Sequence, residues 1–438
     1  MNDRFSPAAV GEHPDQTARR AAAERAVDRG LPSIETEEWR YSPIGDLDPA
    51  GLRPATPADV PAADADPLAA TITDRAATVT LVNGTPSAID VASGWSARGL
   101  TVELDPARRW APTGSDPARP RGPADREDPE AEETLFDLWH QAFSPGAVVV
   151  RVPDGVIVDA PVVIVNRSSG GEVASFSHLV VEAGNGAEVS VVEHAGTAAP
   201  GGLSVPVVEL RADDGAVLTY ELLQEHDRTH WTVGRQRSSA ADRGRLVSAV
   251  AAFGARYART RTDSRLLGRR SRSEMTAAYY GDGEQIHDFR VFQHHEAADT
   301  RSDLLFKGAQ DDASGSIYSG MIHIHPEGSG TDAFQTNRNV KLSPDAWAWS
   351  VPNLEIENND VRCSHASTVS PVDPDQQFYL HSRGVPPVEA DRLIVEGFFD
   401  QVIDRFPTAA VRARIEGLVA DELNRRPVTE PASREAHV

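Results

Sequence analysis

Cysteine and lysine are the residue types in which this chain is poorest. Its 438 residues include one cysteine, Cys363, which excludes an internal disulfide framework and suits a reducing compartment. Of the 43 basic residues two are lysines, Lys307 and Lys341, and neither stands in a G-x-x-x-x-G-K-[ST] sequence. The chain is therefore not expected to be a P-loop ATPase.

Long apolar runs and net positive charge are also absent. No stretch reaches the roughly 18 apolar residues of a membrane span. The N-terminus, MNDRFSPAAVGEHPD, lacks the basic and apolar regions of a secretory signal, so we expect a cytoplasmic location. The formal net charge of −23 argues against nucleic-acid binding, which needs a basic face.

Familiar catalytic motifs are missing as well. No G-x-G-x-x-G follows a strand and opens a helix, which argues against a dinucleotide site. No G-x-S-x-G elbow occurs. The 66 acidic residues are too many for any one pair to stand out as acid and base. The sequence nominates no catalytic residue, and we expect a protein that is not an enzyme.

The N-terminal part of the chain predicts helices separated by loops. Residues 14–29 are rich in helix formers and are followed by Gly30, which favours a helix end. Trp39 and Tyr41 follow as candidate aromatic anchors. Residues 134–146, TLFDLWHQAFSPG, have apolar residues at helical spacing and predict a second helix.

Between these helices the sequence predicts linkers and one strand. Residues 49–70 are rich in Pro, Ala and Asp and predict a mobile linker. Residues 76–83 predict a short strand that ends in the turn dipeptide Asn83-Gly84. Residues 105–130 have little apolar content and predict a surface loop or a disordered insertion.

From Ala147 to about residue 340 the pattern is that of strands. Apolar or alternating runs rich in Val, Ile, Thr and Tyr are punctuated by turn residues such as Asp154-Gly155. Helical periodicity is absent over this stretch. So much β-structure indicates a sandwich, a barrel or a β-solenoid, and no crisp short repeat selects one of them.

After Gly384 the chain is predicted to be helical again. Pro386-Pro387 suits a helix start, and Pro407 separates a second helix that Thr408 could cap. We expect a frayed tail over 426–438. The apolar stripe expected on the first helix consists of Leu393, Ile394, Phe398, Val402 and Ile403.

Cys363 and His365 are the first candidates for a functional site. Residues i and i+2 of a strand face the same side, so a thiolate and an imidazole would meet there and could share a soft metal or the edge of an iron–sulfur cluster. One cysteine cannot hold a cluster alone, so further ligands would come from a partner. The alternative is a buried cysteine beside a hydrogen-bonded histidine.

Other residue pairs carry weaker signals. His323 and His325, with Glu327 after them, could bind a divalent metal in a cupin-type barrel, although this carboxylate follows too closely for that motif. His294 and His295 would point to opposite faces of one strand and could not chelate together.

Asparagine and tryptophan also cluster near the end of the predicted β region. Trp347 and Trp349 are expected to share a face, as core or as interface. Side-chain amides can satisfy backbone groups in solenoid turns. The asparagines expected to do so are Asn337, Asn339, Asn353, Asn358 and Asn359.

The strings SVPNLEIENNDVRCSHAST, FYLHSRGV and EADRLIVEGF, with EWRYS near the N-terminus, resemble the SufD branch of the SufB/SufD family of iron–sulfur cluster assembly scaffolds. SufB proteins differ by having several cysteines. The resemblance implies a mainly β fold with a right-handed parallel β-helix (solenoid) core, flanked by N-terminal and C-terminal helical regions. The expected domains are 1–146, with helices, mixed structure and mobile linkers, 147–384 as the β-helix, and 385–438 as the helical region.

The same resemblance implies a function. The chain would be a non-catalytic scaffold of the SUF system that pairs with a SufB-type protein, carries a SufC-type ATPase on its C-terminal helices and assists iron entry. His365, with Cys363, would lie at the interface with SufB, near a transient iron–sulfur cluster or iron shared with that partner. No cofactor is expected on the chain alone, which could form a homodimer. Nucleic acid and membrane are not expected partners.

Two other functions remain open from the residues. A β-solenoid enzyme acting on polysaccharide would need secretion and a cluster of charged residues on one face. A cupin-like metalloenzyme would use His323 and His325.

Overall fold

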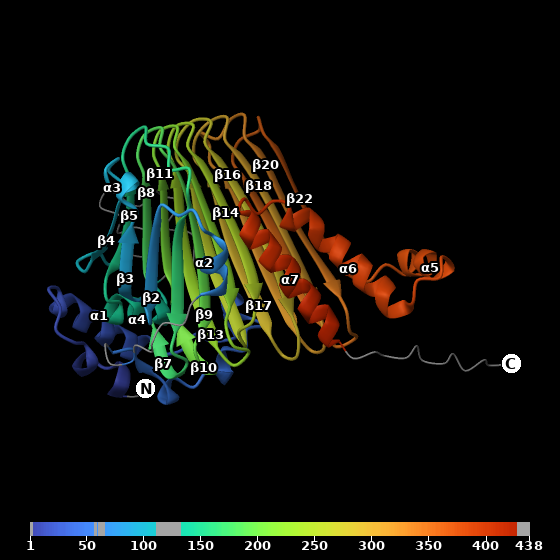
Figure 1. Cartoon of the computed structure of the whole chain (residues 1–438), viewed down its shortest axis with the longest axis horizontal. Coiled ribbons are helices and arrows are strands. Elements are labelled where there is room, and N and C mark those ends of the chain that lie inside the picture. The colour runs from blue at the N-terminus through green and yellow to red at the C-terminus, as the bar shows by residue number, and fades with distance from the viewer. Residues whose placement is uncertain (1–2, 57–58, 60–65, 111–132, 427–438) are drawn as a thin grey trace.

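The computed structural model shows a parallel β-solenoid of about 8 turns with helices at both termini (Figure 1). It describes residues 3–56, 59, 66–110 and 133–426. Strands make up 44% of the structure. A solenoid is therefore the one of the three β architectures that the chain adopts. No helix among the described residues is long and apolar enough to cross a membrane.

Successive strands of the solenoid alternate between two sheets. Each coil returns the chain to the same sheet after about 29 residues, so that Tyr257 pairs with Ile286 and Ile286 with Gly315. Pairing between coils is parallel, which is why no hairpins connect them. The antiparallel strands β3 (Thr85–Val91) and β4 (Thr101–Asp105) flank the N-terminal end of the sheets.

The first sheet has 12 strands and the second has 10. The main path of the first runs through β21 (Trp347–Ile356), β19 (Gly315–Ile324), β17 (Ile286–His295), β15 (Tyr257–Leu266), β13 (Trp231–Ala240), β11 (Val207–Ala212), β8 (His178–Ala183), β5 (Ala147–Val152) and β4, with β1 (Arg53–Pro54), β7 (Gly171–Ser175) and β10 (Gly201–Ser204) beside it. The second runs through β22 (Arg362–Pro371), β20 (Asp332–Lys341), β18 (Arg301–Gln310), β16 (Arg272–Gly281), β14 (Arg245–Phe253), β12 (Val217–Glu225), β9 (Glu188–Thr197), β6 (Val162–Ser168), β2 (Ala77–Val82) and β3.

Helices gather at the two ends of the chain. The α-helices are α1 (Gln16–Arg29), α2 (Pro67–Thr71), α3 (Ser93–Ser96), α4 (Leu135–Phe143), α5 (Pro374–Ser382), α6 (Pro387–Ile403) and α7 (Ala409–Arg425). The short 3-10 helices are η1 (Asp3–Phe5), η2 (Pro7–Ala9), η3 (Glu37–Trp39), η4 (Ile44–Asp46) and η5 (Pro49–Gly51).

Local signals in the sequence set several of these boundaries. Gly30 ends α1 with a φ of 69°, a conformation that suits glycine. Asn83 and Gly84, with φ of 52° and 82°, form the turn between β2 and β3. Thr134 caps α4 in a reciprocal capping box with Asp137. The predictions for Gly30 and for the Asn83-Gly84 turn are confirmed, and the capping box at Thr134 is a finding of the structure.

One turn of each coil uses a residue with positive φ. In these turns the backbone N–H of one coil donates to a carbonyl of the next, as from Gly186 to Asp214 (2.8 Å) and from Gly215 to Asp242 (2.7 Å). The residues in this position are Gly155, Gly186, Gly215, Arg243, Arg270, Asp299 and Gly330. The turns therefore stack as a ladder that fixes the spacing of the coils.

Some expectations fall on residues that the structure does not describe. Most of the loop expected over 105–130 is among them, as are residues 57–58 and 60–65 of the expected linker and all but the first residue of the expected tail. Within the linker the structure places η5, β1 and α2.

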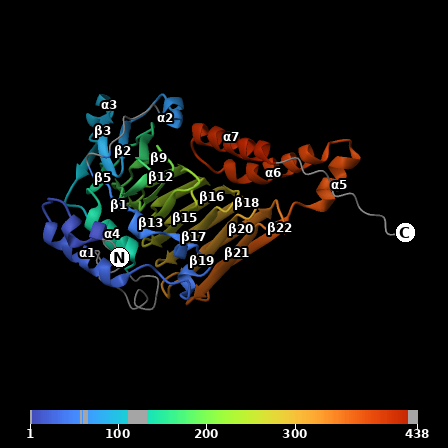
Figure 2. The same cartoon turned by 90° about the horizontal axis from the view of Figure 1, so that it is seen from below.

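The C-terminal helices α6 and α7 cover the outer face of the second sheet (Figure 2). The expected stripe of α6 is confirmed at Val402 and Ile403, which are buried. Elsewhere it is wrong, because Val395 and Phe399 are fully buried whereas Leu393 is exposed. Thr408 occupies the N-cap position of α7 but its side chain makes no capping bond. Its backbone N–H instead donates to the carboxylate of Glu221 at 3.1 Å, which fixes the helix start to β12.

The asparagines near the end of the solenoid serve two different roles. Asn358 lies in a turn and donates to the Pro326 carbonyl at 2.7 Å, as predicted. Asn337 and Asn339 instead lie inside β20, where both side chains are buried. The turn role expected for these two is wrong, because alternation along β20 turns their side chains into the solenoid interior, where they bond to each other (2.8 Å).

Candidate functional site

The Cys363-Ser364-His365 segment lies on β22, the last strand of the second sheet. Cys363 is half-buried beside Ile322 and Ala333, and His365 is exposed next to Gln335 of β20. As residues i and i+2 of one strand, the two side chains share a face, as the sequence predicted. Burial raises the pKa of the Cys363 thiol, so it is protonated at neutral pH and needs a metal or a nearby cation to become a strong ligand.

The solenoid ends openly at β21 and β22. In the part of the chain that the structure describes, each of these strands pairs on one side only. Large apolar side chains are exposed on them, and these are Trp349, Val351, Ile356 and Val369. An unpaired edge that carries apolar side chains is a surface on which another strand or chain can add. The structure thus places Cys363 and His365 at an open end.

The C-terminal helices form a second exposed surface. Helix α5 extends beyond the end of the solenoid (Figure 2) and exposes Phe378 (74%) and Tyr379 (56%). A groove of about 860 Å³ lies between α5, α6 and the strands β18, β20 and β22. Lys307 of β18 donates to the carbonyl of Phe398 at 2.7 Å, which ties α6 to the wall of this groove.

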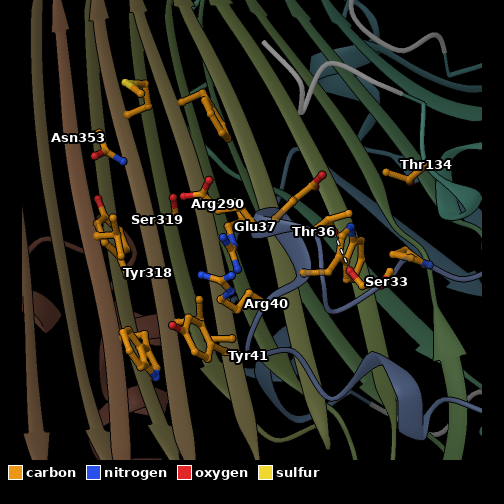
Figure 3. Close-up of a pocket in the computed structure, with 18 of the residues that line it drawn as sticks. Ser33, Thr36, Glu37, Arg40, Tyr41, Thr134, Arg290, Tyr318, Ser319 and Asn353 are labelled. Atoms are coloured by element: carbon orange, nitrogen blue, oxygen red, sulfur yellow. Dashed lines mark hydrogen bonds between the residues drawn. The ribbon is translucent and has the colours of Figure 1, made fainter.

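A larger cavity, of about 1040 Å³, lies on the outer face of the first sheet. Figure 3 shows the segment that carries Ser33, Arg40 and Tyr41 crossing over the strands that carry Arg290 and Ser319. Two aromatic contacts hold the end of this segment. Trp39 is buried under the guanidinium of Arg259 (4.1 Å), and Tyr41 stacks on Trp349 (4.1 Å), so the expected role of Trp39 and Tyr41 as anchors is confirmed.

Three histidines meet in and beside this cavity. His294 of β17 pairs directly with His323 of β19, and His325 follows on the same face. One nitrogen of each ring lies within 4.8 Å of the others. His294 and His295 do point to opposite faces, as predicted, and His295 is buried inside the solenoid against Thr300 (2.8 Å). The partners of His294 come from the next coil, which a search along one strand misses.

The cupin-type barrel expected for His323 and His325 is wrong as a fold, because their strand belongs to a solenoid. Glu327 is exposed in the turn after β19. The carboxylate that contacts His323 is that of Glu357, with Oε1 2.7 Å from Nε2. This carboxylate comes from the end of the neighbouring strand β21 and could not be assigned by spacing along the chain.

Comparison with known proteins gives a family. Residues 164–398 match the family described as "SUF system FeS cluster assembly, SufBD core domain". The chain is 27% identical to the iron–sulfur cluster assembly protein SufD of Bacillus subtilis over 293 residues, which cover 66% of this chain and 67% of that protein. It is 26% identical to the SufD protein of Escherichia coli over 171 residues, 39% of this chain and 40% of that one.

Mycobacterial relatives are more similar over shorter stretches. A SufBD family protein of Mycobacterium leprae is 36% identical over 189 residues, which cover 41% of this chain and 47% of the relative. The chain thus spans about half the length of the mycobacterial relatives that it matches. Because the matched region 164–398 takes in most of the solenoid and more than half of the chain, the chain belongs to the SufBD family of the SUF iron–sulfur cluster assembly system.

Proposed function

We propose that this chain is a non-catalytic scaffold subunit of a SUF complex, paired with a SufB-type protein through the open end of its solenoid. The observation that carries the proposal is the exposure of His365 on the unpaired edge strand β22. A second solenoid could continue both sheets there and cover the apolar side chains. A cytoplasmic, reducing location suits the single thiol.

The nascent iron–sulfur cluster would be cargo at this interface. Cys363 and His365 offer one sulfur and one nitrogen on a shared face, whereas a cluster is held by about four ligands. The remaining ligands would therefore come from the partner. In this arrangement iron could enter at the interface before the cluster is complete, and the chain alone would bind no cluster.

The SufC-type ATPase would dock on the C-terminal helices. Phe378 and Tyr379 on α5 are exposed aromatic side chains of the kind that anchor interfaces. Helix α6 leads from α5 to the second sheet, where Phe399 is buried and Lys307 holds the helix backbone. A movement of the ATPase would thus be transmitted through α6 to β16 and β18, and from β18 through β20 to β22.

The test is co-expression with the SufB-type and SufC-type proteins of the same genome, with a tag on this chain only. We expect a complex of all three chains by light scattering. In the purified complex, His365→Ala should slow cluster assembly severalfold. His381→Ala, which changes an exposed histidine on α5, should weaken docking of the ATPase but should not slow cluster assembly by a complex that has already formed. A lone chain with both partners present and folded would contradict the proposal, as would wild-type assembly by His365→Ala.

A further inference from the structure

We propose that His294, His323 and His325 form a binding site for one divalent transition metal, of the zinc and ferrous iron class, on the outer face of the first sheet. The site belongs to this chain alone and does not depend on the scaffold role. It is separate from Cys363 and His365, which lie on the last strand of the other sheet.

The fold brings the three rings together from two coils. Direct pairing of His294 with His323 sets them on neighbouring strands, and the two-residue step from His323 to His325 keeps the third ring on the same face. The ring centroids of His323 and His325 are 4.0 Å apart, and that of His294 is 5.7 Å and 5.9 Å from them. Small side-chain rotations would bring three nitrogens within the roughly 2.1 Å bonding distance of one metal ion.

One ring of the site has a nitrogen that the protein leaves unsatisfied. Nε2 of His325 is buried and has no hydrogen-bond partner. A buried nitrogen without a partner is costly, and a metal ion would satisfy it.

The surroundings of the three histidine rings also favour a bound cation. Glu357 contacts His323 at 2.7 Å, an arrangement in which a carboxylate orients a metal-binding ring. Glu296 lies near His325, and Asp263 lies near His294. Arg265 is paired with Glu296 at 2.6 Å, and Asp263 is paired with Arg261 at 2.8 Å. Three carboxylates thus lie around the three rings against two guanidinium groups.

The donor set selects the metal class. Neutral imidazoles suit zinc, iron, nickel and copper, whereas magnesium and calcium prefer oxygen ligands. Three protein ligands leave a position open for water or a small ligand. His294 and His323 line the cavity of about 1040 Å³, so that position is reached from the cavity.

The experiment is a titration of the tag-free, metal-stripped full chain with Co²⁺, followed by visible absorption, and with Zn²⁺ by calorimetry. We expect one ion per chain, the absorption of a low-coordinate cobalt site and a higher melting temperature with Zn²⁺. His323→Gln and His325→Gln should each weaken binding by at least about tenfold, and Glu357→Gln should weaken it less.

The controls separate this site from other histidines. His381→Gln, and the double variant Cys363→Ser with His365→Gln, should bind Co²⁺ as the wild type does. Melting curves in chelator establish that each variant is folded. The proposal is overturned if folded wild-type protein binds no stoichiometric ion, if His323→Gln binds like the wild type, or if binding is lost only in the Cys363 and His365 variant.

Discussion

The side chains inside the solenoid change character from one end to the other. The early coils are filled by apolar residues such as Val181 and Leu218. The last coils hold polar side chains, and the hydroxyl of Tyr279 lies within 2.8 Å of Asn339 and 3.1 Å of Asn337. Tyr318, equally buried, has a hydroxyl with no hydrogen-bond partner.

This contrast gives a matched pair of substitutions. Tyr279→Phe should lower the free energy of unfolding by about 1–3 kcal/mol, because it leaves two buried amides with fewer partners. Tyr318→Phe removes the same atom where no bond is lost and should be neutral or slightly stabilising. Urea denaturation of both variants measures this. Equal effects of the two substitutions would contradict the role given to the amide network.

A second buried group, His194, links the solenoid to both helical regions. Its Nδ1 lies 2.7 Å from Asp66, the N-cap of α2, and its Nε2 lies 3.1 Å from Glu225, which also pairs with Arg414 of α7 (3.0 Å). Burial alone would raise the pKa of Glu225, but the ion pairs with His194 and Arg414 outweigh it and lower the pKa to about 2. Burial would lower the pKa of His194, and the two carboxylates raise it instead.

The two shifts predict that the pair of His194 and Glu225 stabilises the fold most in mildly acidic solution. The depressed pKa of Glu225 stabilises the fold above its ordinary value of 4.5, and this stability is lost as pH falls towards 2. The raised pKa of His194 stabilises the fold below 6.5, and that stability is lost as pH rises through the raised value. The stabilisation by this pair, measured as the difference in the free energy of unfolding between wild type and Glu225→Gln, should therefore be largest between these limits. Glu225→Gln should flatten the acid side, and an unchanged profile would contradict the assignment.

At the scale of elements, α6 is fixed by its apolar side. Phe399 is fully buried against the second sheet, whereas Phe378 on α5 is 74% exposed. Phe399→Ala should lower the free energy of unfolding by about 3–5 kcal/mol, because it leaves a cavity, and Phe378→Ala should leave it within about 0.5 kcal/mol of wild type. Thermal and urea denaturation compare the two. Similar losses would show that α5 is packed in solution.

Local sequence signals predicted those elements whose cause is local. Gly30 and the Asn83-Gly84 turn act within a few residues of themselves, and their predictions hold. Helix α5 was not predicted. All its residues are exposed or half-buried, so it has no apolar stripe to reveal it.

The solenoid repeat was hidden for a related reason. The turn position that needs positive φ is glycine in early coils but Arg243, Arg270 and Asp299 in later ones, so no motif recurs. The family resemblance, not spacing, supplied the fold. The approach of His294 to His323 was not predicted, because the two residues lie 29 positions apart, a separation set by the coil length.

At the scale of the whole molecule, the open end predicts self-association. Without a partner, two chains can cover their unpaired edges against each other about a twofold axis. We expect the isolated chain of 47.2 kDa to form a dimer by light scattering. Because both chains carry a net charge of −23, added salt should strengthen the dimer.

A single charge on the edge should separate the two chains. Val369 is 40% exposed on β22, and Val369→Lys should give a monomer with unchanged circular dichroism. The control is Val388→Lys, which places the same charge on α6, where the valine is 50% exposed. A monomeric wild type, or equal loss of the dimer in both variants, would contradict association through the open end.

Because the interior side chains differ between the two ends of the solenoid, we expect its coils to unfold in a definite order. Each coil touches only its neighbours, so a coil can melt without the rest. The N-terminal coils are apolar inside and flanked by β3 and β4, whereas the last coils mix apolar with buried polar side chains and end at β22. Local unfolding should therefore start at β22, and a partner bound there would stabilise this strand. The strand that carries His365 would become rigid when the complex assembles and mobile again when the complex dissociates.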